Sequence, residues 1–322
     1  MITTPNVKIN LGLNVLRKRE DGFHDLETLF VPYFGISDTL EIIVGDDFSR
    51  TSAVLFSRYG SSVPAVQGSI KPEGVFGVET EESVAPKLVK GMSEDGRLMI
   101  TIAREEGVDW DPLKDLTAKA YMILAEDFAL PPVKIFLEKT SPVGAGLGGG
   151  SADAAFALKM LNELCDLGLS EDRLAGYASR LGSDCAFFVY NRPMLGEGRG
   201  EILTEYEIKE IDWQSASEGY PGSVDGSQYD LQVITPSRIS VSTKEAYSGI
   251  RPHLPEVPLK DALARPVEEW DGILMNDFEE TVFAVHPELA AIKRSLYESG
   301  AIYASMSGSG SALFALYRKD IL

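Results

Sequence analysis

The chain has 322 residues, which is enough for one large domain or two of ordinary size. Its formal net charge of −19 argues against a nucleic-acid partner, since a phosphate backbone would be repelled. No apolar run reaches the roughly 18 residues of a membrane span. The first residues lack the basic and apolar blocks of a secretory signal. The two cysteines are far apart in the sequence and indicate no disulfide framework. The sequence therefore predicts a cytoplasmic protein without a membrane partner.

The first expected element is a strand over residues 6–15. Its apolar side chains occupy alternate positions from Val7 to Val15, so they share one face of the strand. Lys8 and Asn10 lie on the opposite, polar face. A lone lysine on a strand is usually solvated, so the pattern alone gives Lys8 no role.

The remaining elements follow in an irregular order. After residue 15 the first half predicts strands at 29–34, 38–45, 97–104, 132–139 and 185–189 and helices at 111–128, 151–168 and 171–181, with residues 46–96 as a loop or weak hairpin. The second half predicts a strand at 230–236, helical stretches at 244–247, 259–264 and 287–300, and a closing hairpin at 302–317. Because this order lacks the regular alternation of a doubly wound sheet, it favours an α+β fold over a Rossmann fold.

A loop with five glycines at residues 144–150 is the most distinctive stretch of the chain. From Gly144 it matches the dinucleotide fingerprint G-x-G-x-x-G, but Ser141-Pro142 separates the glycines from the preceding strand. No acidic residue ends a second strand about 20 positions later, as a dinucleotide site requires. A Walker A loop needs a lysine before its final Ser or Thr, and this loop ends in Gly-Gly-Ser151.

The glycine run still suits phosphate binding. Consecutive glycines let backbone N–H groups approach an anion, and the following helix adds its positive N-terminus. The hydroxyl of Ser151 could meet a phosphate or its magnesium ion. The simpler alternative is a flexible turn in which Ser151 only caps the helix. A second glycine cluster at 307–311 predicts a hairpin turn, which could close over the first loop.

Three segments together resemble the motifs of the GHMP kinase superfamily, which includes galactokinase, homoserine kinase, mevalonate kinase and phosphomevalonate kinase. They are residues 7–13, 142–155 and 306–317, and they span nearly the whole chain. Within the superfamily, residues 8–30, 37–42 and 181–189 are most similar to the branch that acts on 4-diphosphocytidyl-2-C-methyl-D-erythritol. The resemblance implies ATP-dependent phosphorylation of the 2-hydroxyl of that compound, in the non-mevalonate route to isoprenoid precursors.

The same resemblance implies a two-domain α+β architecture. Residues 1–192 would form an ATP-binding domain of the ribosomal-protein-S5-like type. Residues 193–322 would form a ferredoxin-like domain that contributes substrate contacts. The cofactors would be ATP and Mg²⁺, and the protein would be a monomer or a homodimer.

Two residues receive catalytic roles from the resemblance. Asp184 matches the catalytic aspartate, which would accept the proton of the substrate hydroxyl. Lys8 matches the catalytic lysine, which would keep that carboxylate ionised and stabilise the developing alkoxide. By its position alone, an aspartate shortly after the helix-ending Gly182 is more simply a loop or capping residue.

The implied substrate contacts are Asn10, Phe23, His24, Thr243 and Tyr247. Asn10 would bind the methylerythritol hydroxyls from the same strand face as Lys8, and Thr243 would lie near them. The Phe23-His24 element and Tyr247 would hold the cytosine ring by ordinary stacking chemistry. Phe23 and Tyr247 could also be plain packing residues.

The implied ATP contacts are Lys139, Pro142, Gly144, Gly146, Leu147, Gly148, Gly149, Gly150 and Ser151, with Ser151 also a candidate ligand of the Mg²⁺ that ATP carries. Lys139 could equally be a surface lysine. Two positions depart from the family pattern. Asp115 stands where many relatives have an asparagine that contacts adenine, and Ala152 replaces a second serine after the glycines.

Three other functions stay open from the sequence. The first is another GHMP kinase acting on homoserine, mevalonate or a sugar, although Phe23-His24 and Tyr247 suit a nucleotide-bearing substrate better. The second is an NAD-binding oxidoreductase. The third is a sensor that binds ATP without turnover, against which the presence of both Lys8 and Asp184 argues.

Overall fold

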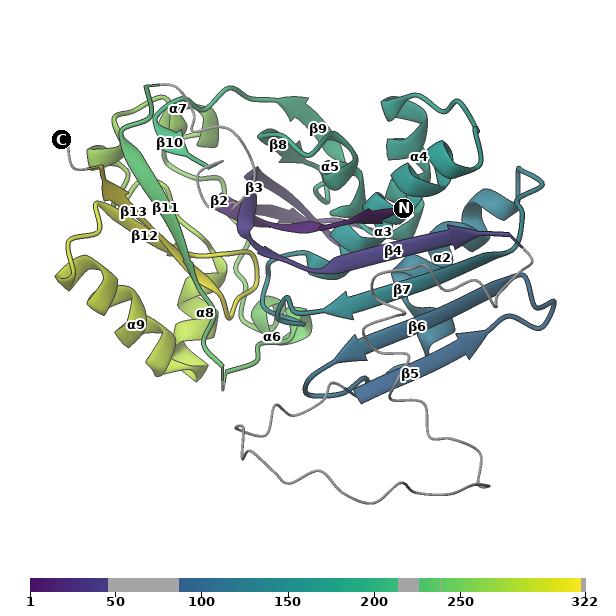
Figure 1. Ribbon diagram of the computed structural model, residues 1–322. Helices are drawn as coiled ribbons and strands as arrows, with labels where there is room; N and C mark the ends of the chain where they lie inside the picture. The colour runs from purple at the N-terminus through teal and green to yellow at the C-terminus, as the bar shows by residue number, and fades with distance from the viewer. Residues whose placement is uncertain (46–86, 214–225, 238, 320–322) are drawn as a thin grey trace, which may run out of the picture.

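The computed structural model describes residues 1–45, 87–213, 226–237 and 239–319 (Figure 1). Most of the segment that the sequence predicts as a loop or weak hairpin, residues 46–86, lies outside the described residues. The last part of that segment is not a loop, because Lys87–Met92 forms strand β5 and pairs antiparallel with β6. No helix within the described ranges is long and apolar enough to cross a membrane.

The largest sheet has five strands, and helices cover one of its faces. Its order is β1 (Ile2–Thr3), β4 (Thr39–Val44), β7 (Val133–Lys139), β6 (Leu98–Arg104) and β5 (Lys87–Met92). The short 3-10 helix η2 (Pro112–Lys114) precedes the covering helices, which are α2 (Leu116–Ala125), α3 (Gly149–Leu164), α4 (Glu171–Leu181) and α5 (Cys185–Tyr190). Figure 1 shows α2 and α3 behind this sheet.

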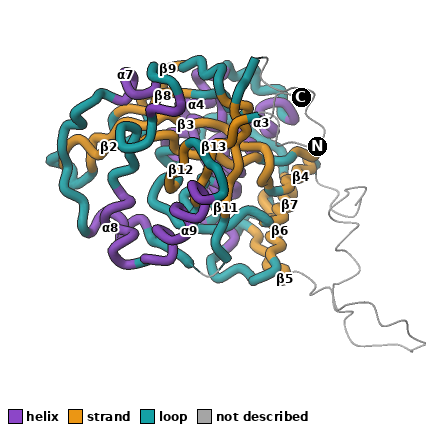
Figure 2. Tube along the Cα trace, turned by 90° about the vertical axis from the view of Figure 1, so that its left-hand side faces the viewer, coloured by secondary structure: helices purple, strands orange, loops and turns teal. Residues whose placement is uncertain are grey.

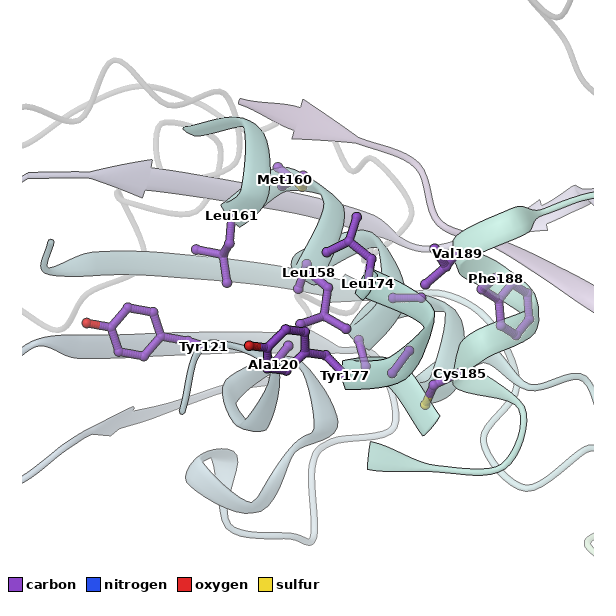
Figure 3. Close-up of a cluster of buried hydrophobic side chains, with 14 of the residues drawn as sticks. Ala120, Tyr121, Leu158, Met160, Leu161, Leu174, Tyr177, Cys185, Phe188 and Val189 are labelled. Atoms are coloured by element: carbon purple, nitrogen blue, oxygen red, sulfur yellow. The ribbon is translucent and has the colours of Figure 1, made fainter. Parts of the chain in front are cut away.

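Apolar side chains from both layers form one buried core. Ile42 and Ile135 point from the sheet into the same cluster as Leu158 and Leu161 of α3 and Tyr177 of α4. Figure 3 shows part of this cluster between the helices. The helical spacing of the apolar residues in 151–168 is thus explained by burial, and the predicted helices at 111–128, 151–168 and 171–181 are confirmed.

The predicted strand at 185–189 is wrong, because Cys185–Tyr190 is helix α5. All five residues from Cys185 to Val189 are buried, and the helix packs against α3 and α4. A short, uninterrupted apolar run carries no periodicity that separates a buried strand from a buried helix. The helix begins directly after Asp184, which places that carboxylate at its N-terminal end.

A second sheet holds the long first strand in the middle of the molecule. Its order is β2 (Asn6–Lys18), β3 (His24–Ser37), β8 (Met194–Glu197) and β9 (Ile202–Glu205). The apolar face of β2 packs on residues of the C-terminal sheet, including Phe314. Lys8 and Asn10 are buried on the other face of the strand. The predicted domain boundary at residue 192 lies between α5 and β8, and β8 pairs with β3 across it.

The third sheet and its helices form the other end of the molecule. Its order is β10 (Ile211–Asp212), β11 (Tyr229–Ile234), β13 (Leu313–Arg318) and β12 (Tyr303–Met306). The remaining helices are α6 (Thr243–Ser248), α7 (Leu259–Leu263), η3 (Val267–Glu269), α8 (Phe278–Val285) and α9 (Pro287–Glu298). Helix α9 packs on β12 and β13, and Figure 2 shows it beside these strands. The closing hairpin at 302–317 is confirmed as β12 and β13.

Candidate active site

A cleft of about 840 Å³ lies where the three sheets approach one another. Its volume is within the range of small-molecule sites. Every predicted site residue lines this cleft except Leu147, whose side chain is buried in the core beneath it. Leu147 therefore offers only its main chain to a ligand, and its carbonyl already accepts a hydrogen bond from the N–H of Lys8 at 3.0 Å.

The glycine loop packs directly against the second glycine cluster. A Cβ atom on Gly146 would lie 2.2 Å from the carbonyl oxygen of Ser307, and Gly146 has a φ of +75°. The N–H of Ala312 donates to the carbonyl of Ala145 at 3.1 Å. The two clusters are thus one unit, and the expectation that the second closes over the first is confirmed. Gly308 and Ser309 also line the cleft.

Helix α3 begins at the loop without a side-chain cap. Its N-cap is Gly148, in the left-handed conformation at φ 73°, so Ser151 is not the N-cap. Gly149, Gly150 and Ser151 form the first turn and line the cleft. The N–H groups of a first helical turn have no partner within the helix, and together with the helix dipole they favour an anion.

Lys8 and Asp184 form an ion pair in the cleft. Lys8 Nζ lies 3.4 Å from Asp184 Oδ2, with the side chain of Lys8 only 3% exposed and that of Asp184 31% exposed. Lys8 Nζ also donates to Asn10 Oδ1 and, at 2.9 Å, to the carbonyl of Gly146. Burial lowers the pKa of Lys8, and the charge of Asp184 opposes that shift. Asp184 makes no side-chain capping hydrogen bond to α5, so its carboxylate is not used as a helix cap.

Asn10 is held by the protein on both sides of its amide. Its Nδ2 donates to Thr28 Oγ1 at 3.1 Å, and its Oδ1 accepts from Lys8. Its main-chain N–H donates to Ser307 Oγ at 3.2 Å, which connects the first strand to the C-terminal hairpin. The side chain is therefore fixed in orientation before any ligand arrives.

Three aromatic side chains predicted as base contacts lie at the rim of the cleft. Tyr247 stacks on His24, with ring centroids 4.8 Å apart and planes at 23°, and it contacts Phe278 edge-on. Burial lowers the pKa of His24 and raises that of Tyr247. Phe23 is 55% exposed, and the Arg199 guanidinium lies 4.9 Å from its ring centroid. Arg199 was not among the residues to which the sequence analysis assigned a role.

Lys139 is a buried residue rather than a surface lysine. Its Nζ donates to Asp38 Oδ2 at 2.5 Å, to Asp153 Oδ2 at 2.8 Å and to Ser141 Oγ at 3.1 Å. Burial disfavours its charge, but the two carboxylates outweigh this effect and raise its pKa. Burial raises the pKa of Asp153 well above its usual range. Asp38 and Asp153 were missed by sequence reasoning, although Asp153 is the lone acid in an alanine-rich helix turn.

Two further residues complete this end of the cleft. Asp115 caps α2 by accepting from the N–H of Thr117 at 2.9 Å, and it accepts from Trp110 Nε1 at 3.0 Å. Both Asp115 and Trp110 line the cleft. The oxygens of Asp115 are thus engaged by the protein, whereas Asp153 Oδ1 is buried without a hydrogen-bond partner among the described residues.

The cleft holds few groups that suit a resident metal ion. Among the described residues, no group of three or more His, Cys, Asp or Glu side chains is arranged to bind a metal. Ser151 and Asp184 both line the cleft and offer oxygen atoms. This donor set fits Mg²⁺ that is held mainly by phosphate oxygens and water, with one or two protein ligands.

The contact between the glycine clusters predicts a difference between two glycine substitutions. Gly146→Ala should lower the free energy of unfolding by about 1–3 kcal/mol, because it combines a left-handed backbone with a collision against Ser307. Gly150→Ala should be neutral or stabilising by up to about 1 kcal/mol, since its Cβ would meet nothing within 4 Å and alanine favours helix. Urea denaturation without nucleotide measures both, and equal stabilities would contradict the packing described here.

The buried carboxylates predict a pH-dependent cost for losing Lys139. Lys139→Met leaves Asp38 and Asp153 without their cation and should lower the free energy of unfolding by about 3–5 kcal/mol at pH 7.5. The unpaired acids then have raised pKa values in the folded state, so the variant regains stability as the pH falls and they bind protons. Denaturation at several pH values checks this, with the exposed Lys119→Met as control. A deficit that is constant between pH 8 and pH 5 would contradict it.

Comparison with known proteins identifies the family of the chain. The model for the N-terminal domain of GHMP kinases matches residues 115–192, and the model for their C-terminal domain matches residues 259–321. A 4-diphosphocytidyl-2-C-methyl-D-erythritol kinase from Bacteroides fragilis is 40% identical over 99% of this chain and 93% of its own length. The corresponding kinase from Bacteroides thetaiotaomicron is 41% identical, with the same coverage of both chains.

Solved structures give the same grouping. A crystal structure of 4-(cytidine 5'-diphospho)-2C-methyl-D-erythritol kinase has a TM-score of 0.65 and 26% identity, covering 98% of this chain and 90% of that one. Homoserine kinase from Cytophaga hutchinsonii has a TM-score of 0.56 at 17% identity, covering 98% of this chain and 86% of that one, and shows the shared fold. With the two-domain α+β fold and the glycine loop in place, the chain belongs to the GHMP kinases and, within them, to the family of 4-diphosphocytidyl-2-C-methyl-D-erythritol kinases.

Proposed function

We propose that the protein transfers the γ-phosphate of ATP to the 2-hydroxyl of 4-diphosphocytidyl-2-C-methyl-D-erythritol. The observation that carries the proposal is the ion pair between the buried Lys8 and the partly exposed Asp184 beside the glycine loop, in a cleft whose rim is aromatic. The names of the similar proteins from two Bacteroides species support the choice of substrate. The cytoplasmic location, the monomeric or dimeric state and the boundary at residue 192 stay predictions.

The triphosphate of ATP would lie against the glycine loop and the start of α3. Cβ atoms built on Gly144 and Gly150 meet nothing within 4 Å, so the backbone is open to a close ligand at these two points. The binding charge would come from N–H groups and the helix dipole. Lys139 adds no net positive charge, because Asp38 and Asp153 compensate it. Its role in this proposal is to hold the start of α3 in place.

Asp184 would act as the general base. Its partly exposed carboxylate would accept the proton of the 2-hydroxyl as that oxygen bonds to the γ-phosphorus, while the bond from this phosphorus to the β,γ-bridging oxygen breaks and ADP leaves. Lys8 has three N–H donors, and its Nζ donates to oxygens of Asn10 and Gly146 and forms an ion pair with Asp184. The contact with Asp184 is the longest of the three. We infer that the substrate oxygen competes for this donor, which brings the oxygen to the carboxylate and the cation together.

Mg²⁺ would enter with ATP. Ser151 is the residue that would hold it, since its hydroxyl group lies in the first turn of α3 and the residue lines the cleft. When bound, the ion would neutralise the charge that develops between the β- and γ-phosphates. The protein's own part is to orient the ATP phosphates through the loop backbone and the 2-hydroxyl through Asn10 and Lys8.

A substrate panel with ATP tests the proposed function. Phosphorylation of 4-diphosphocytidyl-2-C-methyl-D-erythritol, detected as a product heavier by one phosphate, should exceed any activity on mevalonate, homoserine or galactose. Turnover of one of these instead would assign the protein to another GHMP activity. ATP binding without any turnover would favour the sensor hypothesis, and tight NAD binding would favour the oxidoreductase.

Removing the base should slow the chemical step while leaving binding intact. Asp184→Asn should lower kcat by about 10²- to 10⁴-fold with an unchanged dissociation constant for ATP, since the carboxamide cannot accept the proton. Asp166→Asn is a matched control outside the cleft, because Asp166 is exposed and has a φ of 51° that asparagine tolerates. A near-normal kcat for Asp184→Asn would remove Asp184 from the base role.

A further inference from the structure

Four cationic side chains from lysine and arginine line the described part of the cleft, namely Lys8, Lys139, Arg199 and Lys244. Lys8 pairs with Asp184, and Lys139 lies between two buried carboxylates. These two charges are therefore compensated inside the protein. Lys244 is exposed on α6. Arg199 is the cation that the fold holds at the aromatic rim.

The turn that carries Arg199 is fixed to the first hairpin. It connects β8 to β9, and β8 pairs with β3. The carbonyl of Gly198 accepts from the N–H of Leu26 at 2.7 Å, and a Cβ on Gly200 would lie 3.3 Å from Phe30. The N–H of Arg199 itself donates to Glu201 Oε2. These contacts on both sides of Arg199 hold its main chain in place, so that its side chain starts beside Phe23.

The guanidinium group of Arg199 is held in one orientation, but the protein does not provide an acceptor for every one of its hydrogen-bond donors. It stacks on the Phe23 ring at 4.9 Å, and its Nε lies 3.6 Å from Glu201 Oε1. No side-chain hydrogen bond joins Arg199 to any other described residue, so its two terminal amino groups have no protein acceptor there. The side chain is 39% exposed. A planar guanidinium held in this way can bind two phosphate oxygens at once.

We propose that Arg199 binds the diphosphate of the cytidyl substrate and makes this end of the cleft select a nucleoside diphosphate over a nucleoside. The inference rests on the proposed function. In that substrate the diphosphate joins the cytidine to the methylerythritol. Arg199 stacks on Phe23, which directly precedes His24 in the predicted base-binding element, so the diphosphate on the ribose of a cytidine bound there would lie within reach of its side chain. ATP would be unaffected, because its phosphates bind the backbone at the start of α3.

The inference is tested by comparing the binding of two ligands to the wild type and to two variants. The dissociation constants of CDP and of cytidine are measured by calorimetry for the full-length protein, Arg199→Gln and Arg199→Lys. The wild type should prefer CDP, and Arg199→Gln should weaken CDP about 10- to 100-fold while leaving cytidine within about two-fold. Arg199→Lys keeps the charge but loses the planar fork, so it should recover part of the CDP affinity.

Arg192→Gln is the matched control. The Arg192 guanidinium stacks on Tyr190 at 5.2 Å and has a similar exposure of 36%, but it does not line the cleft. This variant should bind CDP as the wild type does. In turnover assays Arg199→Gln should raise KM for the cytidyl substrate with little change in kcat or in KM for ATP.

Several results would overturn the inference. One is an equal loss of CDP and cytidine in Arg199→Gln, which would mean that Arg199 only supports the Phe23 ring. Others are an unchanged CDP affinity in that variant, or a wild type that binds CDP no better than cytidine. Failure of the proposed function appears elsewhere, in the absence of turnover of the cytidyl substrate by the wild type.

Discussion

The carbonyl oxygen of Gly146 is the point on which the site depends. It accepts hydrogen bonds from Lys8 Nζ at 2.9 Å and from Ser307 Oγ at 3.2 Å. Ser307 Oγ in turn accepts from the N–H of Asn10. The glycine loop, strand β2 and the C-terminal hairpin therefore meet at one main-chain group. A side chain at residue 146 would separate them, which explains why the loop must be glycine at this position.

The charge arrangement of the cleft follows from the acidity of the chain. With a net charge of −19, the protein does not attract polyphosphates by its overall field. Its buried cations are paired, since an uncompensated buried charge is costly. Lys8 and Lys139 consequently act as positioned donors with neighbouring carboxylates. In the proposed complexes the attraction for phosphate would then come from backbone N–H groups, a helix terminus and Arg199 at the rim.

The local patterns predicted most of the fold but not the pairings made across it. The alternation in β2, the helical spacing in α3 and the turn at the second glycine cluster all appear in the structure. Helix α5 was predicted as a strand, because its five apolar residues have no period. The burial of Lys139 was also missed, since its partners Asp38 and Asp153 are 101 and 14 residues away. Long-range pairings of this kind leave no local signal.

The stacked rings of His24 and Tyr247 bear on how a base can enter. A base between two rings needs two contact layers of about 3.5 Å each, so the rings would stand about 7 Å apart. In the structure their centroids are 4.8 Å apart. An aromatic pair contributes only about 0.5–1.5 kcal/mol beyond its buried area, and an inserted base would replace one stacking contact with two. In the proposed complex the two new stacking contacts would therefore offset the loss of the contact between the rings, which orients both of them beforehand.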